Sequence, residues 1–172
     1  MALLKETGTY GQVEPNNLSG RRSGRVYAQK EMKAGVLDTL ADKKLQNGMF
    51  MVYDLAEGCH VDGTKGELGL VFNEVKIYDD SRESYRDFYV KPGTDGKIFP
   101  RIIGLVKNDV YTTNMVDLTT AFGTGATAGL KLVPVNGVLT ETAAPADTDI
   151  VLTIVKETTM PDGSKAVKVQ YL

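Results

Sequence analysis

From residue 49 to residue 172 the chain is a succession of short apolar segments, separated by turn-forming residues roughly every 8–12 positions. No segment here carries the apolar repeat of three and four residues that marks an amphipathic helix. Asn136-Gly137 suits a type I′ hairpin, because both turn positions need positive φ. The stretch 161–163, Pro-Asp-Gly, is typical of a turn that ends on a left-handed glycine. The pattern predicts a mainly β fold, an antiparallel β-barrel or sandwich.

The predicted strands are rich in Val, Ile, Leu, Tyr and Thr. The first begins with an unbroken apolar run and is expected to be buried on both faces. In the last, Lys168 and Gln170 alternate with apolar residues, which indicates one buried and one solvated face. The predicted strands are 49–57, 68–79, 85–90, 97–106, 109–116, 129–135, 138–141, 149–157 and 166–172.

Residues 1–46 differ in composition and are predicted to form a long irregular N-terminal arm, followed by the β domain over residues 47–172. The arm is polar, dotted with glycine and poorly periodic, and only 36–45 has the apolar repeat of a short helix. Residues 1–35 hold six lysines and arginines against three glutamates, although the whole chain has a net charge of −2. This asymmetry indicates a basic arm on an acidic body, or a chance excess at these small counts.

Composition excludes several classes of protein. A chain of 172 residues is long enough to bury a core without cross-links, and its one cysteine, Cys59, excludes an intrachain disulfide. No run of about 18 apolar residues is present, so we expect no membrane-spanning helix. The N-terminus lacks the apolar core of a signal peptide, so we expect synthesis in the cytoplasm. The small net charge gives no reason to expect nucleic acid or a membrane as a partner.

One motif is shared with dinucleotide-binding proteins. Gly123, Gly125 and Ala128 fit the pattern G-x-G-x-x-[G/A], and Glu141 stands near the place of the acidic residue that binds the ribose. That pattern binds phosphate only when a helix follows it, because the amides and the dipole of the helix make the site. Residues 129–135 are predicted to be a strand. We therefore interpret the motif as a loop between two strands, suited to packing against a neighbouring subunit, and expect no cofactor.

Two other clusters carry chemically capable side chains. Cys59 and His60 are adjacent, and adjacent strand residues point to opposite faces, so we expect neither a catalytic pair nor a zinc site. Four carboxylates lie between residues 79 and 87. They could bind calcium or act as a catalytic pair, but their spacing fits no EF-hand, and Arg82 and Arg86 would repel a cation. We predict a solvated loop with local ion pairs, and a chain without catalytic residues or a metal.

Three stretches resemble the small capsid-decorating, or cement, proteins of tailed bacteriophages. They are residues 46–58 (QNGMFMVYDLAEG), residues 107–116 (KNDVYTTNMV) and residues 151–172 (VLTIVKETTMPDGSKAVKVQYL). The resemblance covers about residues 46–172, and the N-terminal segment aligns with no specific part of that family. It implies a non-enzymatic β protein of the virion that binds the major capsid protein on the outside of the shell, as a monomer or a homotrimer.

The candidate partner contacts come from the arm and from the glycine-rich loop. A polar arm is expected to become ordered on a partner, and arginine pairs well with the carboxylates of a protein surface. Two alternatives stay open. One is a trimeric fibre or receptor-binding module of a virion, and the other is a small enzyme that uses the carboxylates of residues 79–87. The candidate contacts are Arg21, Arg22, Arg25, Tyr27, Phe122 and Thr124.

Overall fold

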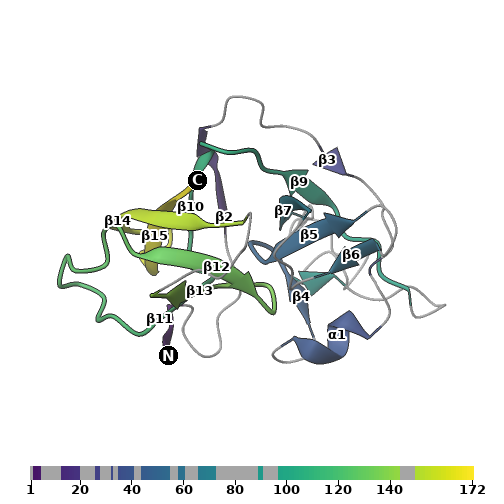
Figure 1. Ribbon diagram of the computed structural model, residues 1–172, viewed down its shortest axis with the longest axis horizontal. Helices are drawn as coiled ribbons and strands as arrows, with labels where there is room; N and C mark the ends of the chain where they lie inside the picture. The colour runs from purple at the N-terminus through teal and green to yellow at the C-terminus, as the bar shows by residue number, and fades with distance from the viewer. Residues whose placement is uncertain are drawn as a thin grey trace.

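The fold of the chain is mainly β, as the sequence predicts (Figure 1). The strands form two larger sheets and one two-stranded pair, and the only helix among the described residues is a single turn. The sequence predicts a barrel or a sandwich, and no closed barrel is formed by the part of the chain that is described. The computed structural model describes residues 2–4, 13–19, 26–27, 32, 35–40, 44–54, 58–60, 66–72, 89–90, 97–143 and 150–172.

The larger sheet has eight strands in the order β1-β11-β13-β12-β14-β15-β10-β2. The prediction of an antiparallel fold is wrong at one pair, since β11 and β13 run parallel. The reason is the connection: β11 leaves through a long loop into β12, and the β12–β13 hairpin then returns β13 in the direction of β11. The bounds are β1 Ala2–Leu3, β2 Val13–Ser19, β10 Val110–Thr113, β11 Val116–Leu118, β12 Lys131–Val135, β13 Val138–Thr142, β14 Leu152–Thr159 and β15 Lys165–Tyr171.

Strands β10 and β11 lie on consecutive stretches of chain, although they pair at different places in the strand order. The predicted single strand 109–116 is interrupted because the Thr113 side-chain oxygen accepts a hydrogen bond from the Met115 amide (3.0 Å). Only two residues separate the strands, and three extended steps span at most about 11 Å. The six strands from β10 to β15 therefore curl strongly, while β1 and β2 pair with the outer edges of β11 and β10.

The second sheet has five strands in the order β3-β9-β7-β5-β6, and β4 pairs with β8 beside it. Gly69 of β7 pairs with Gly104 of β9 at the centre of this sheet. A Cβ at Gly69 would overlap the Cγ2 of Ile102, so the close approach of these two strands requires glycine. The bounds are β3 Val26–Tyr27, β4 Leu45–Gln46, β5 Phe50–Asp54, β6 Gly58–His60, β7 Glu67–Val71, β8 Tyr89–Val90 and β9 Ile102–Gly104.

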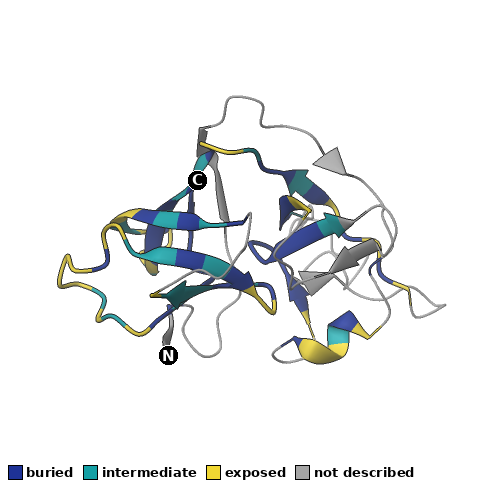
Figure 2. Cartoon of the chain, in the orientation of Figure 1, coloured by how far each residue is buried: buried dark blue, intermediate teal, exposed yellow. Residues whose placement is uncertain are grey.

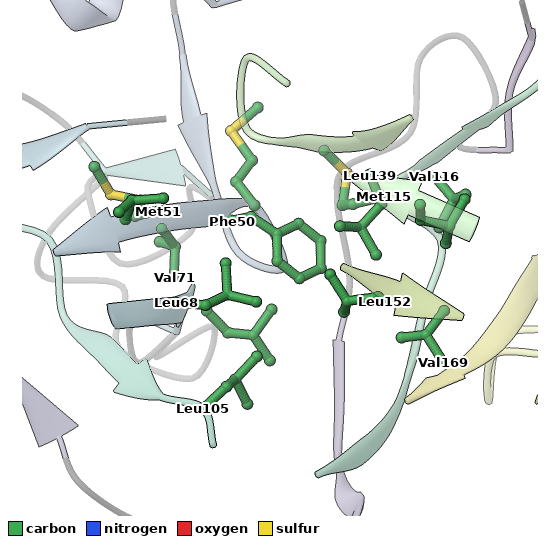
Figure 3. Close-up of a cluster of buried hydrophobic side chains, with 14 of the residues drawn as sticks. Phe50, Met51, Leu68, Val71, Leu105, Met115, Val116, Leu139, Leu152 and Val169 are labelled. Atoms are coloured by element: carbon green, nitrogen blue, oxygen red, sulfur yellow. The ribbon is translucent and has the colours of Figure 1, made fainter. Parts of the chain in front are cut away.

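The core is one continuous cluster of buried side chains that joins both sheets (Figures 2 and 3). Phe50 of β5 is fully buried, and its ring centroid lies 5.9 Å from that of Tyr111 on β10. The following residues Met51 and Val52 are also fully buried, which confirms the prediction that this strand is covered on both faces. The alternation predicted for β15 is confirmed as well, since Val167, Val169 and Tyr171 are buried.

Both predicted turns are confirmed. Asn136 has φ 48° and Gly137 has φ 79°, as a type I′ turn requires. At the β14–β15 turn Gly163 has φ 84°, and its amide donates to the carbonyl oxygen of Met160 (2.9 Å). Asp162 closes this turn, because its Oδ1 accepts hydrogen bonds from both the amide and the hydroxyl of Ser164.

The predicted helix over residues 36–45 is much shorter in the structure. Helix α1 covers Val36–Thr39 and ends at Leu40, which is extended and buried. Its N-cap is Gly35, without a side-chain cap, and β4 begins at Leu45. Tertiary burial of Leu40 and Leu45 thus overrides the weak helical repeat.

Described parts of the predicted arm belong to the core of the protein. Leu4, Met32, Val36, Leu40 and Leu45 are all buried in the common cluster. The domain boundary at residue 46 therefore stays a prediction from amino-acid composition. These five side chains pack the N-terminal segment against the sheets.

Candidate functional site

The glycine-rich segment forms the long loop between β11 and β12, residues 119–130, which projects beyond the ends of the strands of the eight-stranded sheet (Figure 1). Most of its residues are exposed, as the yellow stretches in Figure 2 show. Gly123, Gly125 and Gly129 have φ of 91°, 73° and 84°, a conformation that other residues rarely adopt. Strand β12 follows the motif directly, as the sequence predicts.

The carboxylate of Glu141, on β13, binds the start of this loop. Its Oε2 accepts hydrogen bonds from the backbone amides of Thr119 (2.8 Å) and Thr120 (2.9 Å), and its Oε1 accepts one from the Thr120 hydroxyl (2.9 Å). Hydrogen bonds to an ionised carboxylate are stronger than those between neutral groups. Glu141 therefore fixes the first turn of the loop to the sheet.

A second carboxylate, that of Glu157 on β14, binds the middle of the loop. Its Oε2 accepts a hydrogen bond from the Gly123 amide (3.0 Å), and its Oε1 accepts one from the hydroxyl of Thr127 (2.8 Å), which is fully buried. The end of the loop is joined to β14 by the backbone, since the Gly129 amide donates to Ile154 O and the Ile154 amide donates to Leu130 O. The loop is thus attached to the sheet at its start, in its middle and at its end.

Phe122 and Thr124, the two candidate contacts in this loop, have different surroundings. Phe122 is half-buried and packs against the core, and the Lys165 ammonium lies 5.9 Å from its ring centroid, within reach of a cation–π interaction. Thr124 is exposed. Its hydroxyl donates to Ala121 O (2.9 Å) and accepts from the Ala126 amide (3.3 Å), which stiffens the tip. Phe122 thus anchors the loop, and the exposed residues beside it form its outer surface.

The resemblance to a phosphate-binding motif has a physical explanation in these contacts. Three loop amides, those of Thr119, Thr120 and Gly123, already donate to carboxylates of the same chain. A phosphate would have to displace Glu141 or Glu157, and no helix follows to supply further amides. The glycines allow the backbone of the loop to adopt the positive φ angles that its path requires. The contacts describe an exposed loop that is anchored to the sheet.

Hydrogen exchange tests the second of the two anchors. Replacement of Glu157 by glutamine keeps the size of the side chain but leaves one oxygen acceptor in place of two. Exchange of the Gly123 amide is expected to become about tenfold faster or more, because a charge-assisted hydrogen bond is lost or weakened. The amides of Asn108 and Asp109, in the turn that precedes β10, are hydrogen-bonded to Tyr171 O and Val106 O; they serve as the control and should keep their rates. Unchanged exchange at Gly123 would contradict the anchoring role.

The pKa of Glu141 provides a pH-dependent test of the first anchor. Partial burial acts to raise this pKa, but the hydrogen bonds from Thr120 and Thr119 together lower it below its ordinary value of 4.5. Because the folded pKa is depressed, this carboxylate stabilises the folded loop at pH values above the unfolded pKa. That stabilisation is lost as the pH falls through the folded pKa. The Thr119 and Thr120 amide resonances are expected to titrate with a midpoint below 4.5 and to stop titrating in Glu141→Gln; a midpoint above 4.5 would contradict the account.

The remaining sequence-predicted residues do not meet at this loop within the described structure. Tyr27 lies on β3, in the five-stranded sheet, where it pairs with Ile102. Cys59 and His60 lie on β6, opposite Tyr53 and Val52. Arg21, Arg22, Arg25 and the acidic cluster of residues 79–87 lie outside the described residues.

The hydrogen bonds by which Glu141 and Glu157 anchor the loop were not predicted from the sequence. Each glutamate is a polar residue near the solvated end of a strand, and such residues ordinarily face water. The sequence feature that could have indicated an anchor is the pair of threonines at residues 119–120. Their backbone amides and a hydroxyl need hydrogen-bond acceptors where the chain leaves the sheet. That signal gives no partner, because the anchors lie 21 to 34 positions further along the chain.

Comparison of the chain with protein-family models, with curated proteins and with solved structures finds no match. In the described ranges, no three residues of the types His, Cys, Asp and Glu are grouped so that they could hold a metal ion. No helix in the same ranges is long and apolar enough to cross a membrane.

Proposed function

We propose that the chain is a non-enzymatic virion protein that binds the outside of a bacteriophage capsid and stabilises or decorates the shell. Its partner would be the major capsid protein, and its location the capsid surface. The support from sequence is the resemblance of residues 46–172 to capsid-decorating proteins. The support from structure is the mainly β fold with its strands in two larger sheets, since capsid-decorating proteins of this kind are expected to be β-barrels or sandwiches.

The main structural support for this proposal is the loop of residues 119–130, which two carboxylates attach to the sheet. Binding costs conformational entropy when a flexible loop must become ordered, and this cost is smaller for a loop that is already fixed. Glu141 and Glu157 fix this loop while its tip stays exposed. It therefore suits contact with a large protein surface, and repetition of the protein on a shell multiplies weak contacts.

The N-terminal segment is proposed to add contacts through Arg21, Arg22, Arg25 and Tyr27. Deletion of residues 1–46 does not test this idea cleanly, because the deletion also removes buried side chains such as Leu4 and Met32 from the core. Replacement of the three arginines by glutamine removes their charge and leaves the core residues in place. Weaker capsid binding by that variant, with unchanged thermal stability, would support the proposed contacts.

Immunolabelling of particles tests the proposed location. Tailed-phage particles made from the genome that encodes the chain are purified on a density gradient and labelled with a gold-conjugated antibody against the chain. The proposal predicts label over the whole surface of the head. Label confined to the tail or its fibres would favour the fibre or receptor-binding alternative, and intact particles without the chain would contradict both.

A further inference from the structure

Two buried oxygen atoms near the junction of the two sheets have no hydrogen-bond partner among the described residues. They are Oδ1 of Asp109 and the hydroxyl oxygen of Tyr111, and both side chains are completely buried. Buried polar groups in folded proteins are almost always paired, because an unpaired one loses its hydrogen bonds to water on folding. These two atoms belong to residues only two positions apart, whereas the third such atom in the described residues, Asp117 Oδ1, lies on β11.

Asp109 lies in the turn that carries the chain from β9, in one sheet, to β10, in the other. Its amide donates to Val106 O (3.0 Å), and its Oδ2 accepts a hydrogen bond from the Val106 amide (2.9 Å). Its carbonyl oxygen accepts one from the Tyr171 amide (3.0 Å), which joins the turn to β15. One carboxylate oxygen of Asp109, Oδ2, thus closes the turn. The other, Oδ1, is the oxygen without a hydrogen-bond partner among the described residues.

Tyr111 is two residues further along, on β10, and its hydroxyl is the second unpaired oxygen. Burial raises the pKa of Tyr111 well above its ordinary value, and the charge of Asp109 raises it further, followed by Tyr171. The hydroxyl therefore keeps its proton at neutral pH and is a hydrogen-bond donor. Asp109 Oδ1 is an acceptor, but the two atoms form no direct hydrogen bond.

We propose that one internal water molecule joins these two groups. The Tyr111 hydroxyl donates to the water oxygen, and the water donates to Asp109 Oδ1. A bridging water connects oxygen atoms that are roughly 5 Å apart, too far for a direct bond. A calcium ion does not fit, because it takes six to eight oxygen ligands and a protonated phenol directs a donor at its partner. The bridge stabilises the turn at the start of β10.

A high-resolution crystal structure of the full chain tests the proposal directly. We expect one water within about 2.6–3.2 Å of both Asp109 Oδ1 and the Tyr111 hydroxyl. Three results would overturn the proposal: a direct Asp109–Tyr111 hydrogen bond, a donor from another part of the chain in this position, or no water that reaches both atoms.

The thermal stability of Tyr111→Phe provides a second test, which depends on the direction in which the unfolding midpoint changes. If the water bridge exists, removal of the hydroxyl loses a hydrogen bond, and the unfolding midpoint falls by about 2–4 °C. If the hydroxyl is unpaired, its removal leaves the midpoint unchanged or raises it, and the proposal fails. Asp109→Asn and the double variant complete a cycle. If both groups share one water, the double variant is expected to lose less stability than the sum of the two single losses. Strictly additive losses would contradict the bridge.

Discussion

Replacement of Phe50 by alanine is expected to lower the free energy of unfolding by about 3–5 kcal/mol, the largest loss of any substitution considered. The Phe50 ring is fully buried and lies where side chains of both sheets meet, 5.9 Å from the ring of Tyr111 (Figure 3). Alanine would leave a cavity that the surrounding strands cannot fill. A loss of that size is a large part of the 5–15 kcal/mol that stabilises a typical domain. Urea unfolding followed by circular dichroism measures it.

Phe99 supplies a matched control for this prediction. Its side chain is 46% exposed, so Phe99→Ala removes the same atoms from a site where water already reaches them. We expect a change within about 0.5 kcal/mol for the control. Equal losses at the two positions would show that Phe50 does not join the sheets into one core.

Replacement of Gly69 by alanine is expected to destabilise the protein by about 1–3 kcal/mol or more, although it adds a single methyl group. The added Cβ would overlap Cγ2 of Ile102 and lie 3.2 Å from the carbonyl oxygen of Ile103, which is part of the β9 backbone and cannot move aside. Strands β7 and β9 would have to separate, at the centre of the five-stranded sheet. Thermal unfolding measures the loss.

The variant Ile102→Ala tests the cause of this effect. It removes the Cγ2 atom that the new methyl group would meet, so the double variant should be less unstable than the sum of the single losses. Gly69 does not have a positive φ, so its substitution carries no left-handed backbone penalty and the whole loss is expected from the close contact. Losses that simply add in the double variant would contradict the proposed steric clash.

Much of the β structure could be predicted from the sequence because its signals are local. The alternation around Lys168 and Gln170 depends only on the period of a strand, and the Asn136-Gly137 turn depends only on the φ that two residues accept. The loop at residues 119–130 belongs to the same group. Its interpretation needed only the strand that follows the glycine motif.

The features that the sequence did not predict depend on long-range pairing. Residues 109–116 have the pattern of one strand. The Thr113 side chain, however, accepts a hydrogen bond from the Met115 amide, and the segment is divided into two strands at different places in the sheet. The parallel pair β11–β13 arises because the β12–β13 hairpin returns the chain in the direction of β11. The anchors Glu141 and Glu157 have no local pattern, because their partners lie on a distant segment of chain.

Cosedimentation with capsids tests the proposed binding to the shell. The purified chain is mixed with purified shells of the major capsid protein from the same genome, and the pelleted amount is measured against concentration. We expect saturable binding at a fixed ratio of chain to capsid protein. Ala126→Arg, at the exposed tip of the loop, should weaken binding by about tenfold or more, whereas Val135→Arg, at the opposite end of β12, should not. A chain that stays in the supernatant at every concentration would contradict the account.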